Sequence, residues 1–114
     1  MSQVDETTLL APFEIWEVML DDSTIKFFEP LVLTPARMPH DPDEPGDVEY
    51  WEVEMPELMI STFGTDYEKI HNGVLSDIRD AWKHIVAIPD SRLSPNGKKI
   101  KQNYLGIAEE IFDE

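Results

Sequence analysis

The carboxylates of residues 41–52, DPDEPGDVEYWE, come nearest in this sequence to the spacing of a metal site. The twelve-residue calcium loop of EF-hand proteins needs oxygen ligands at alternate positions and a glycine at the sixth. Asp41, Asp43, Gly46 and Glu52 occupy the first, third, sixth and twelfth positions of that pattern. Pro45 stands at the fifth, where an oxygen-bearing side chain is expected, and the flanking residues do not have helical composition. The segment is therefore predicted to be an acidic hairpin loop rather than a calcium loop.

The remaining residues that could carry out catalysis lack the spacing that catalysis requires. Metal-assisted phosphodiester hydrolysis needs converging carboxylates, whereas Glu49 points to the opposite side of a strand from Glu52 and Glu54. His71 and His84 are thirteen residues apart on one predicted helix, so they cannot bind one metal ion within a monomer. No serine lies in a nucleophile-elbow sequence. We therefore expect no enzymatic activity, no cofactor and no metal.

Acidic charge is concentrated in one half of the chain and indicates the kind of partner. The 114 residues carry a net charge of −15. Residues 1–66 contain sixteen acidic residues and two basic ones, whereas residues 67–114 contain eight acidic and seven basic ones. Such an acidic half favours association with a basic protein. We predict that this partner contacts the proline-rich segment 35–47 and its neighbours, through Asp41, Asp43, Glu44, Asp47 and Glu49.

Direct binding of nucleic acid is disfavoured by the same charge. Lys98, Lys99 and Lys101 form the only basic cluster in the sequence. Three lysines on an acidic chain are more typical of a solvated helix face than of a DNA contact.

The sequence contains no cysteine and no apolar run of the length that a membrane span needs, and from its N-terminal residues we expect no export signal. A chain without cysteine fits a reducing compartment. We expect a cytoplasmic protein that does not enter a membrane.

The first half is predicted to contain a flexible N-terminal segment, residues 1–12, followed by strands. Residues 13–114 are expected to form one domain. Segments 13–20 and 25–34 have strand composition and are separated by the turn sequence DDST, so they are predicted to pair as a hairpin. Pro30 within the second strand indicates an edge position or a bulge.

The segment 48–86 predicts two strands and a long helix. Residues 48–54 and 58–63 are strand-like, and Pro56 ends the first of them. Thr65 and Glu68 match a capping box at the start of a helix over residues 65–86. Its apolar face recurs at helical spacing and consists of Ile70, Val74, Ile78, Ala81, Trp82 and Ile85.

A second helix is predicted from the Ser94-Pro95 start to about Phe112. Its apolar stripe is narrow and it contains Gly97 and Gly106, so it needs a surface to pack against. We therefore expect a homodimer or a higher oligomer. Altogether the sequence predicts an α+β fold with a three- or four-stranded antiparallel sheet, one long helix and a C-terminal helix.

The order of these elements resembles the HicB-like antitoxin family. The resemblance rests on the YWEVEMPEL corner (50–58), on TFGTDYE (62–68) and on the helix that follows, and it covers about residues 25–112. It implies a truncated ribonuclease-H-like βββα unit without catalytic acids. The implied function is to neutralise a small basic RNA-cleaving toxin of the HicA type. The alternative that remains open is a stand-alone domain that self-associates or acts as a scaffold.

Overall fold

The computed structural model of the chain describes residues 11–37 and 50–112. The described strands form two antiparallel three-stranded sheets. In the first sheet, β1 (Phe13–Met19) and β2 (Ser23–Leu33) form the predicted hairpin, and β6 (Ala108–Phe112) pairs with the other edge of β2. The turn between β1 and β2 is closed by a 2.8 Å hydrogen bond from the Leu20 amide to the Ser23 carbonyl.

The second sheet contains β3 (Ala36–Arg37), β4 (Trp51–Met55) and β5 (Ile60–Gly64) in that order. A short 3₁₀ turn, η1 (Pro56–Leu58), joins β4 to β5, and Met59 after it adopts the left-handed conformation with φ 57°. The proline therefore ends β4 as the sequence predicted, because it cannot donate to the ladder.

The long helix begins at α2 (Tyr67–Ala81) and continues as a π-helical turn, η2 (Trp82–Val86). Its predicted capping box is wrong in one respect. Asp66, not Thr65, is the N-cap, and its Oδ1 accepts a 2.9 Å hydrogen bond from the Lys69 amide. The carboxylate of Asp66 thus satisfies one free amide of the first turn and adds a negative charge at the positive end of the helix.

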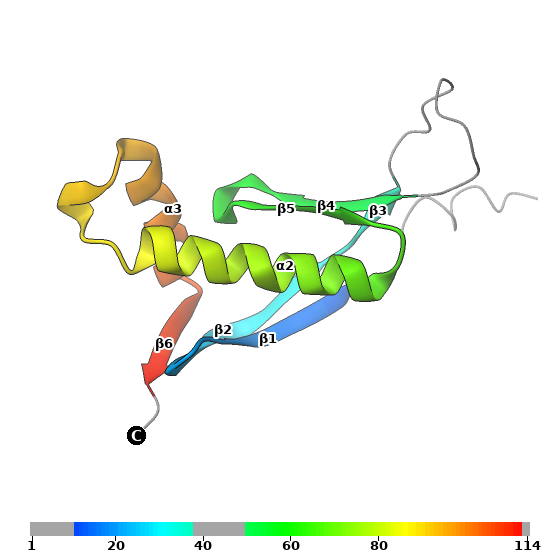
Figure 1. Cartoon of the computed structure of the whole chain (residues 1–114), viewed down its shortest axis with the longest axis horizontal. Coiled ribbons are helices and arrows are strands. Elements are labelled where there is room, and N and C mark those ends of the chain that lie inside the picture. The colour runs from blue at the N-terminus through cyan, green and yellow to red at the C-terminus, as the bar shows by residue number, and fades with distance from the viewer. Residues whose placement is uncertain (1–10, 38–49, 113–114) are drawn as a thin grey trace, which may run out of the picture.

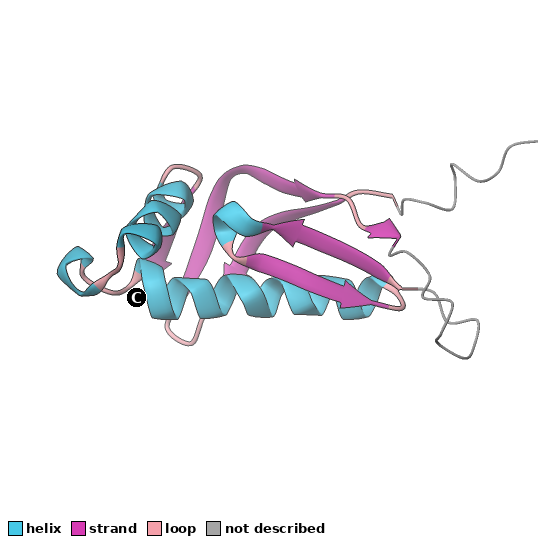
Figure 2. Cartoon of the chain, turned by 90° about the horizontal axis from the view of Figure 1, so that it is seen from above, coloured by secondary structure: helices cyan, strands magenta, loops and turns pink. Residues whose placement is uncertain are grey.

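Helix α2 runs between the β4–β5 hairpin and the β1–β2 hairpin (Figure 1), and Figure 2 shows the β4–β5 hairpin lying along its length. Its predicted apolar face is buried against the strands, with Ile70, Val74 and Ile78 fully enclosed. Trp82 and Val86 in η2 are also buried, while Ile85 is partly buried. One hydrophobic cluster includes side chains from both sheets, α2, η2 and α3.

The second helix is shorter than predicted. Ser94 caps α3 (Pro95–Leu105) through a 3.1 Å hydrogen bond from the Gly97 amide. The chain then turns at Gly106 and continues as β6 instead of remaining helical to Phe112. The edge of β2 supplies hydrogen-bond partners for these residues, so the strand satisfies backbone groups that a helix end would leave free.

Helix α3 packs on the corner between β4 and β5. The buried Tyr104 hydroxyl donates a 2.5 Å hydrogen bond to the Leu58 carbonyl, and Asn103 donates to the Glu57 carbonyl at 2.9 Å. Burial, and secondarily the Asp77 carboxylate, raises the pKa of the Tyr104 phenol. The Tyr104 ring also meets Trp82 edge to face, with centroids 5.9 Å apart. The C-terminal segment is thus part of the same core.

The predicted α+β class is confirmed, with antiparallel strands, one long helix and a C-terminal helix. Its strands divide between two sheets. No helix in the described ranges has the length and apolarity to cross a membrane.

Candidate functional site

The five acidic residues predicted to bind a partner, Asp41, Asp43, Glu44, Asp47 and Glu49, lie outside the described residues. Most of the calcium-like segment 41–52 lies there too. Its last residue, Glu52, stands within β4 opposite Phe63, which agrees with the prediction that it belongs to a strand. Within the described ranges no three or more His, Asp or Glu side chains gather as a metal site.

The solvent face of β4 and β5 combines carboxylates with exposed aromatic rings. Val53 is buried, so its neighbours Glu52 and Glu54 lie on the opposite side of β4. Phe63 pairs with Glu52 across the strands and is 65% exposed. The Tyr50 ring meets the Phe63 ring at a centroid distance of 6.3 Å. We call Tyr50, Glu52, Glu54 and Phe63 the acidic-aromatic face. In the sequence, the acidic segment that ends at Glu49 directly precedes Tyr50 of this face.

Several carboxylates elsewhere are committed to hydrogen bonds that hold elements together. Asp77 on α2 accepts from the Ser61 amide at 3.0 Å and from the Thr62 hydroxyl at 2.7 Å. Glu110 on β6 accepts from the Ser23 hydroxyl at 2.6 Å and from the Trp82 indole at 2.7 Å. These carboxylates are part of the scaffold.

By contrast, the carboxylates of Glu52 and Glu54 make no hydrogen bond or ion pair with any described residue. Their charge is directed to solvent.

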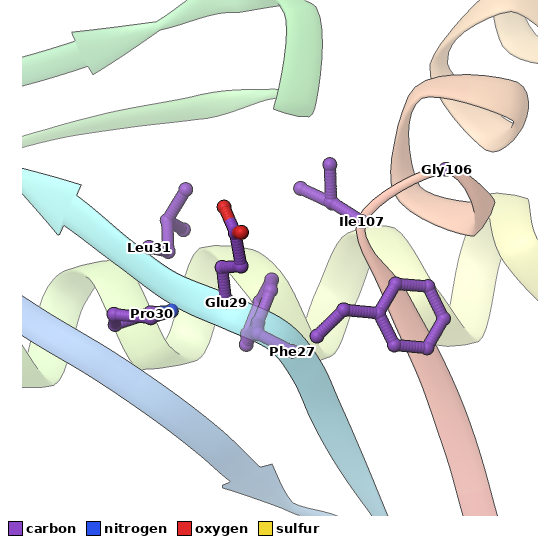
Figure 3. Close-up of a pocket in the computed structure, with 7 residues that line it drawn as sticks. Phe27, Glu29, Pro30, Leu31, Gly106 and Ile107 are labelled. Atoms are coloured by element: carbon purple, nitrogen blue, oxygen red, sulfur yellow. The ribbon is translucent and has the colours of Figure 1, made fainter.

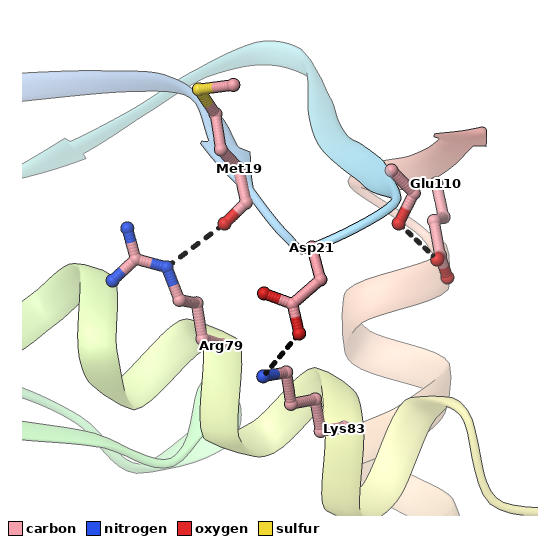
Figure 4. Close-up of polar contacts among 6 residues, drawn as sticks. Met19, Asp21, Arg79, Lys83 and Glu110 are labelled. Atoms are coloured by element: carbon pink, nitrogen blue, oxygen red, sulfur yellow. Dashed lines mark hydrogen bonds and ion pairs between the residues drawn. The ribbon is translucent and has the colours of Figure 1, made fainter. Parts of the chain in front are cut away.

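The basic side chains are also partly engaged in the scaffold. Arg79 donates a 3.0 Å hydrogen bond to the Met19 carbonyl, and Lys83 lies 3.9 Å from the Asp21 carboxylate (Figure 4). Lys101 donates to the Ile88 carbonyl at 2.8 Å and forms a 2.8 Å ion pair with Asp90.

The hydrogen bond and charge of Lys101 lower the pKa of the Asp90 carboxyl. Lys98 and Lys99 remain exposed. The predicted cluster of three lysines therefore leaves two that face solvent and form no ion pair with a described residue.

The described histidines have separate surroundings. His71 packs against Phe13, with ring centroids 5.6 Å apart, and the Tyr67 ring meets Phe13 from the same helix. His84 is exposed on η2, and His40 lies outside the described residues. His71 thus has the environment of a packing residue.

A pocket of about 300 Å³ lies beside β2, and sequence reasoning did not predict it. It is lined by Phe27, Phe28, Glu29, Pro30, Leu31, Gly106 and Ile107. Figure 3 shows the Glu29, Leu31 and Ile107 side chains projecting to the same side of β2. The predicted irregularity at Pro30 was the one local signal for this place, because a proline in a strand marks a bulge.

Comparison with protein-family models, curated proteins and solved structures gives no match for this chain.

Proposed function

We propose that this chain is a non-catalytic binding domain that captures a basic protein in the cytosol. The specific form of the proposal is an antitoxin of the HicB type that neutralises a small basic RNA-cleaving toxin. The observation that carries it is the acidic-aromatic face, whose carboxylates have no partner among the described residues. The acidic residues of segment 41–49 directly precede Tyr50 in the sequence.

The composition of the face fits protein recognition. Exposed aromatic rings supply apolar area at the centre of protein interfaces, and surrounding charges set the orientation and the rate of association. Phe63 and Tyr50 supply the rings, and Glu52 and Glu54 supply the charges. A basic surface on the partner would complement all four.

The test begins with the partner purified from the native host on the tagged full chain and then identified. Its association rate with the chain is measured from low to high salt. The double variant E52Q/E54Q should slow association by about 3–10-fold at low salt, because charges at an interface act mainly on the association rate. Adding D41N, D43N, E44Q, D47N and E49Q should slow it further. Phe63→Ala should mainly speed dissociation, because it removes apolar contact.

The matched control is E68Q/D80N, which removes two exposed charges from α2. It changes the net charge equally but leaves the acidic-aromatic face intact. Equal slowing by both double variants would mean that only net charge matters. If the partner is an RNA-cleaving toxin, the wild-type chain should stop cleavage in a stoichiometric mixture. Cleavage that continues in the formed complex would reject the antitoxin form of the proposal.

Self-association is a second candidate, because the first sheet exposes an apolar surface. Trp16 on β1 and Phe28 on β2 are 59% and 58% exposed, and Val32 opposite Glu14 is 52% exposed. Light scattering of the full chain measures its mass. A dimer that dissociates in Trp16→Ser would favour this candidate, whereas a monomer at high micromolar concentration would reject it.

A further inference from the structure

We propose that the pocket beside β2 receives an arginine side chain of the basic partner. The inference rests on the proposed function for the identity of the partner, while the pocket and its chemistry belong to this chain alone. It names the chemical group that the chain recognises, which the acidic charge by itself does not.

The pocket forms because β2 separates from both of its neighbours at the same place. Ile15 pairs with Leu31 and Glu17 pairs with Lys26, so residues 27–30 of β2 lie opposite Trp16 alone. Pro30 within this bulge has no amide to donate. The departure from β1 is therefore built into the backbone.

On the other side of β2, pairing with β6 ends at Phe27 and Ala108. One further bond follows, 2.9 Å from the Phe28 amide to the Ile107 carbonyl. The α3–β6 turn at Gly106 then leads the chain away from β2. The space between the bulge and this turn is the pocket.

The chemistry of the lining is apolar with one charge. The side chains of Phe27, Phe28, Pro30, Leu31 and Ile107 are all apolar, and Glu29 is the one ionisable residue in the lining. Figure 3 shows the Glu29 carboxylate on the same side of β2 as Leu31 and Ile107. Within the described part of the chain it has no hydrogen bond or ion pair.

The nearest basic residue along β2 has other neighbours. Lys26 stands opposite Glu17 on β1 and opposite Glu109 on β6. Two acidic residues therefore already flank the lysine across the sheet. The negative charge of Glu29 is left for a group that enters from outside.

An arginine side chain matches an apolar pocket with a single carboxylate better than a lysine side chain or a cofactor does. Its three-carbon stem can lie on the apolar wall, and its planar guanidinium can donate two parallel hydrogen bonds to one carboxylate. The guanidinium also packs against apolar and aromatic side chains, which make up the rest of the lining. A volume of about 300 Å³ is at the lower limit for small-molecule sites, so the pocket suits one side chain rather than a cofactor.

The experiment titrates the labelled full chain with N-acetyl-argininamide and follows its amide signals by NMR. Shifts are expected at residues 27–29, 31, 106 and 107, with weak but saturable binding. The neutral isostere N-acetyl-citrullinamide should bind about 10-fold more weakly, since it lacks the charge that strengthens hydrogen bonds to a carboxylate. N-acetyl-lysinamide should also bind more weakly, because an ammonium cannot form the double hydrogen bond.

Variants locate the site. Glu29→Gln should weaken argininamide binding about 10-fold, by loss of a charge-assisted pair. Glu14→Gln is the matched control, because Glu14 is an exposed acid on β1 that does not line the pocket. Both substitutions are at exposed positions, so the fold should persist. Equal binding of argininamide and citrullinamide, shifts confined to other residues, or unchanged binding by Glu29→Gln would each overturn the proposal. Equal binding of lysinamide would overturn the choice of arginine.

The outcome is separate from the test of the proposed function, because the titration uses no partner. If argininamide binds the pocket but E52Q/E54Q leaves the association rate of the partner unchanged, the arginine pocket is supported and the role of the acidic-aromatic face is rejected. If E52Q/E54Q slows association of the partner but argininamide does not bind, the proposed function is supported and the arginine pocket is rejected.

Discussion

Gly73→Ala should destabilise this protein although it improves a helix. Gly73 lies in the middle of α2, where alanine is ordinarily favoured by about 1 kcal/mol. A Cβ at this position would lie 3.0 Å from Thr62 Oγ1 and still closer to Thr62 Cγ2. Thr62 is on β5 and is itself buried. The substitution therefore forces α2 away from the strand, and overpacking of this kind costs about 1–3 kcal/mol.

The displacement also acts on the hydrogen bonds between the same two elements. Asp77, one turn further along α2, accepts from the Ser61 amide at 3.0 Å and from the Thr62 hydroxyl at 2.7 Å. Lengthening these hydrogen bonds to the Asp77 carboxylate further lowers the stability of the fold. We expect a net destabilisation of about 1–2 kcal/mol, which corresponds to roughly 4 °C in Tm for each kcal/mol at this chain length.

Urea and thermal unfolding followed by circular dichroism measure the change, with two companion variants. Gly97→Ala on α3 is the control, since its Cβ would be no nearer than 3.4 Å to any neighbour, and it should be neutral or stabilising by up to about 1 kcal/mol. Thr62→Ser removes Cγ2 and keeps the hydroxyl, so in the double variant it should recover part of the loss. The reasoning is refuted if Gly73→Ala is as stable as the wild type, or if Thr62→Ser recovers nothing.

Three further predictions concern side chains of η2 and α3. Trp82→Ala should destabilise the fold by about 3–5 kcal/mol, because it empties a buried site and removes the indole that donates to Glu110. Trp82→Phe loses mainly this donor and should cost about 1–3 kcal/mol in the same unfolding assay. Equal effects of the two substitutions would contradict this division. Tyr104→Phe should cost about 1–2 kcal/mol by leaving the Leu58 carbonyl without its donor. Burial raises the pKa of Tyr104, so the stability that the neutral phenol contributes to the folded state is fully present below the ordinary phenol range. This stability falls as the pH rises above about 10. Tyr104→Phe should therefore reduce the loss of stability at alkaline pH. Lys101→Met should raise the depressed pKa of Asp90, measured by NMR of its carboxyl carbon, and an unchanged titration would show that the ion pair does not form in solution.

The antiparallel hairpin of β1 and β2 and the buried face of α2 could be predicted from the sequence. Both depend on local periodicity, since alternating residues select the two faces of a strand and a 3.6-residue period selects one face of a helix. The proline corner after β4 was predictable for a local reason too, because a residue without an amide cannot extend the ladder. The candidate acidic face was predictable in part, as excess charge followed by strand alternation at Glu52 and Glu54.

The end of the chain shows what local pattern cannot decide. The stripe of Ile100, Tyr104, Ile107 and Ile111 has helical spacing, and it predicted one helix throughout. The structure keeps Ile100 and Tyr104 in α3 but places Ile111 in β6. Only the edge of β2, distant in sequence, offers the ladder partners and the Ser23 hydroxyl that hold Glu110 and its neighbours extended.

The sequence by itself thus determined the elements whose period is local, together with the acidic charge of the first half of the chain. Tertiary structure decided where α3 ends, why Gly73 lies against Thr62, and where β2 leaves both neighbours to open a pocket beside Glu29. Each of these depends on atoms brought together from distant positions in the chain. These features are stabilised by close packing and by hydrogen bonds between elements, and neither can be recognised from the periodicity of the local sequence.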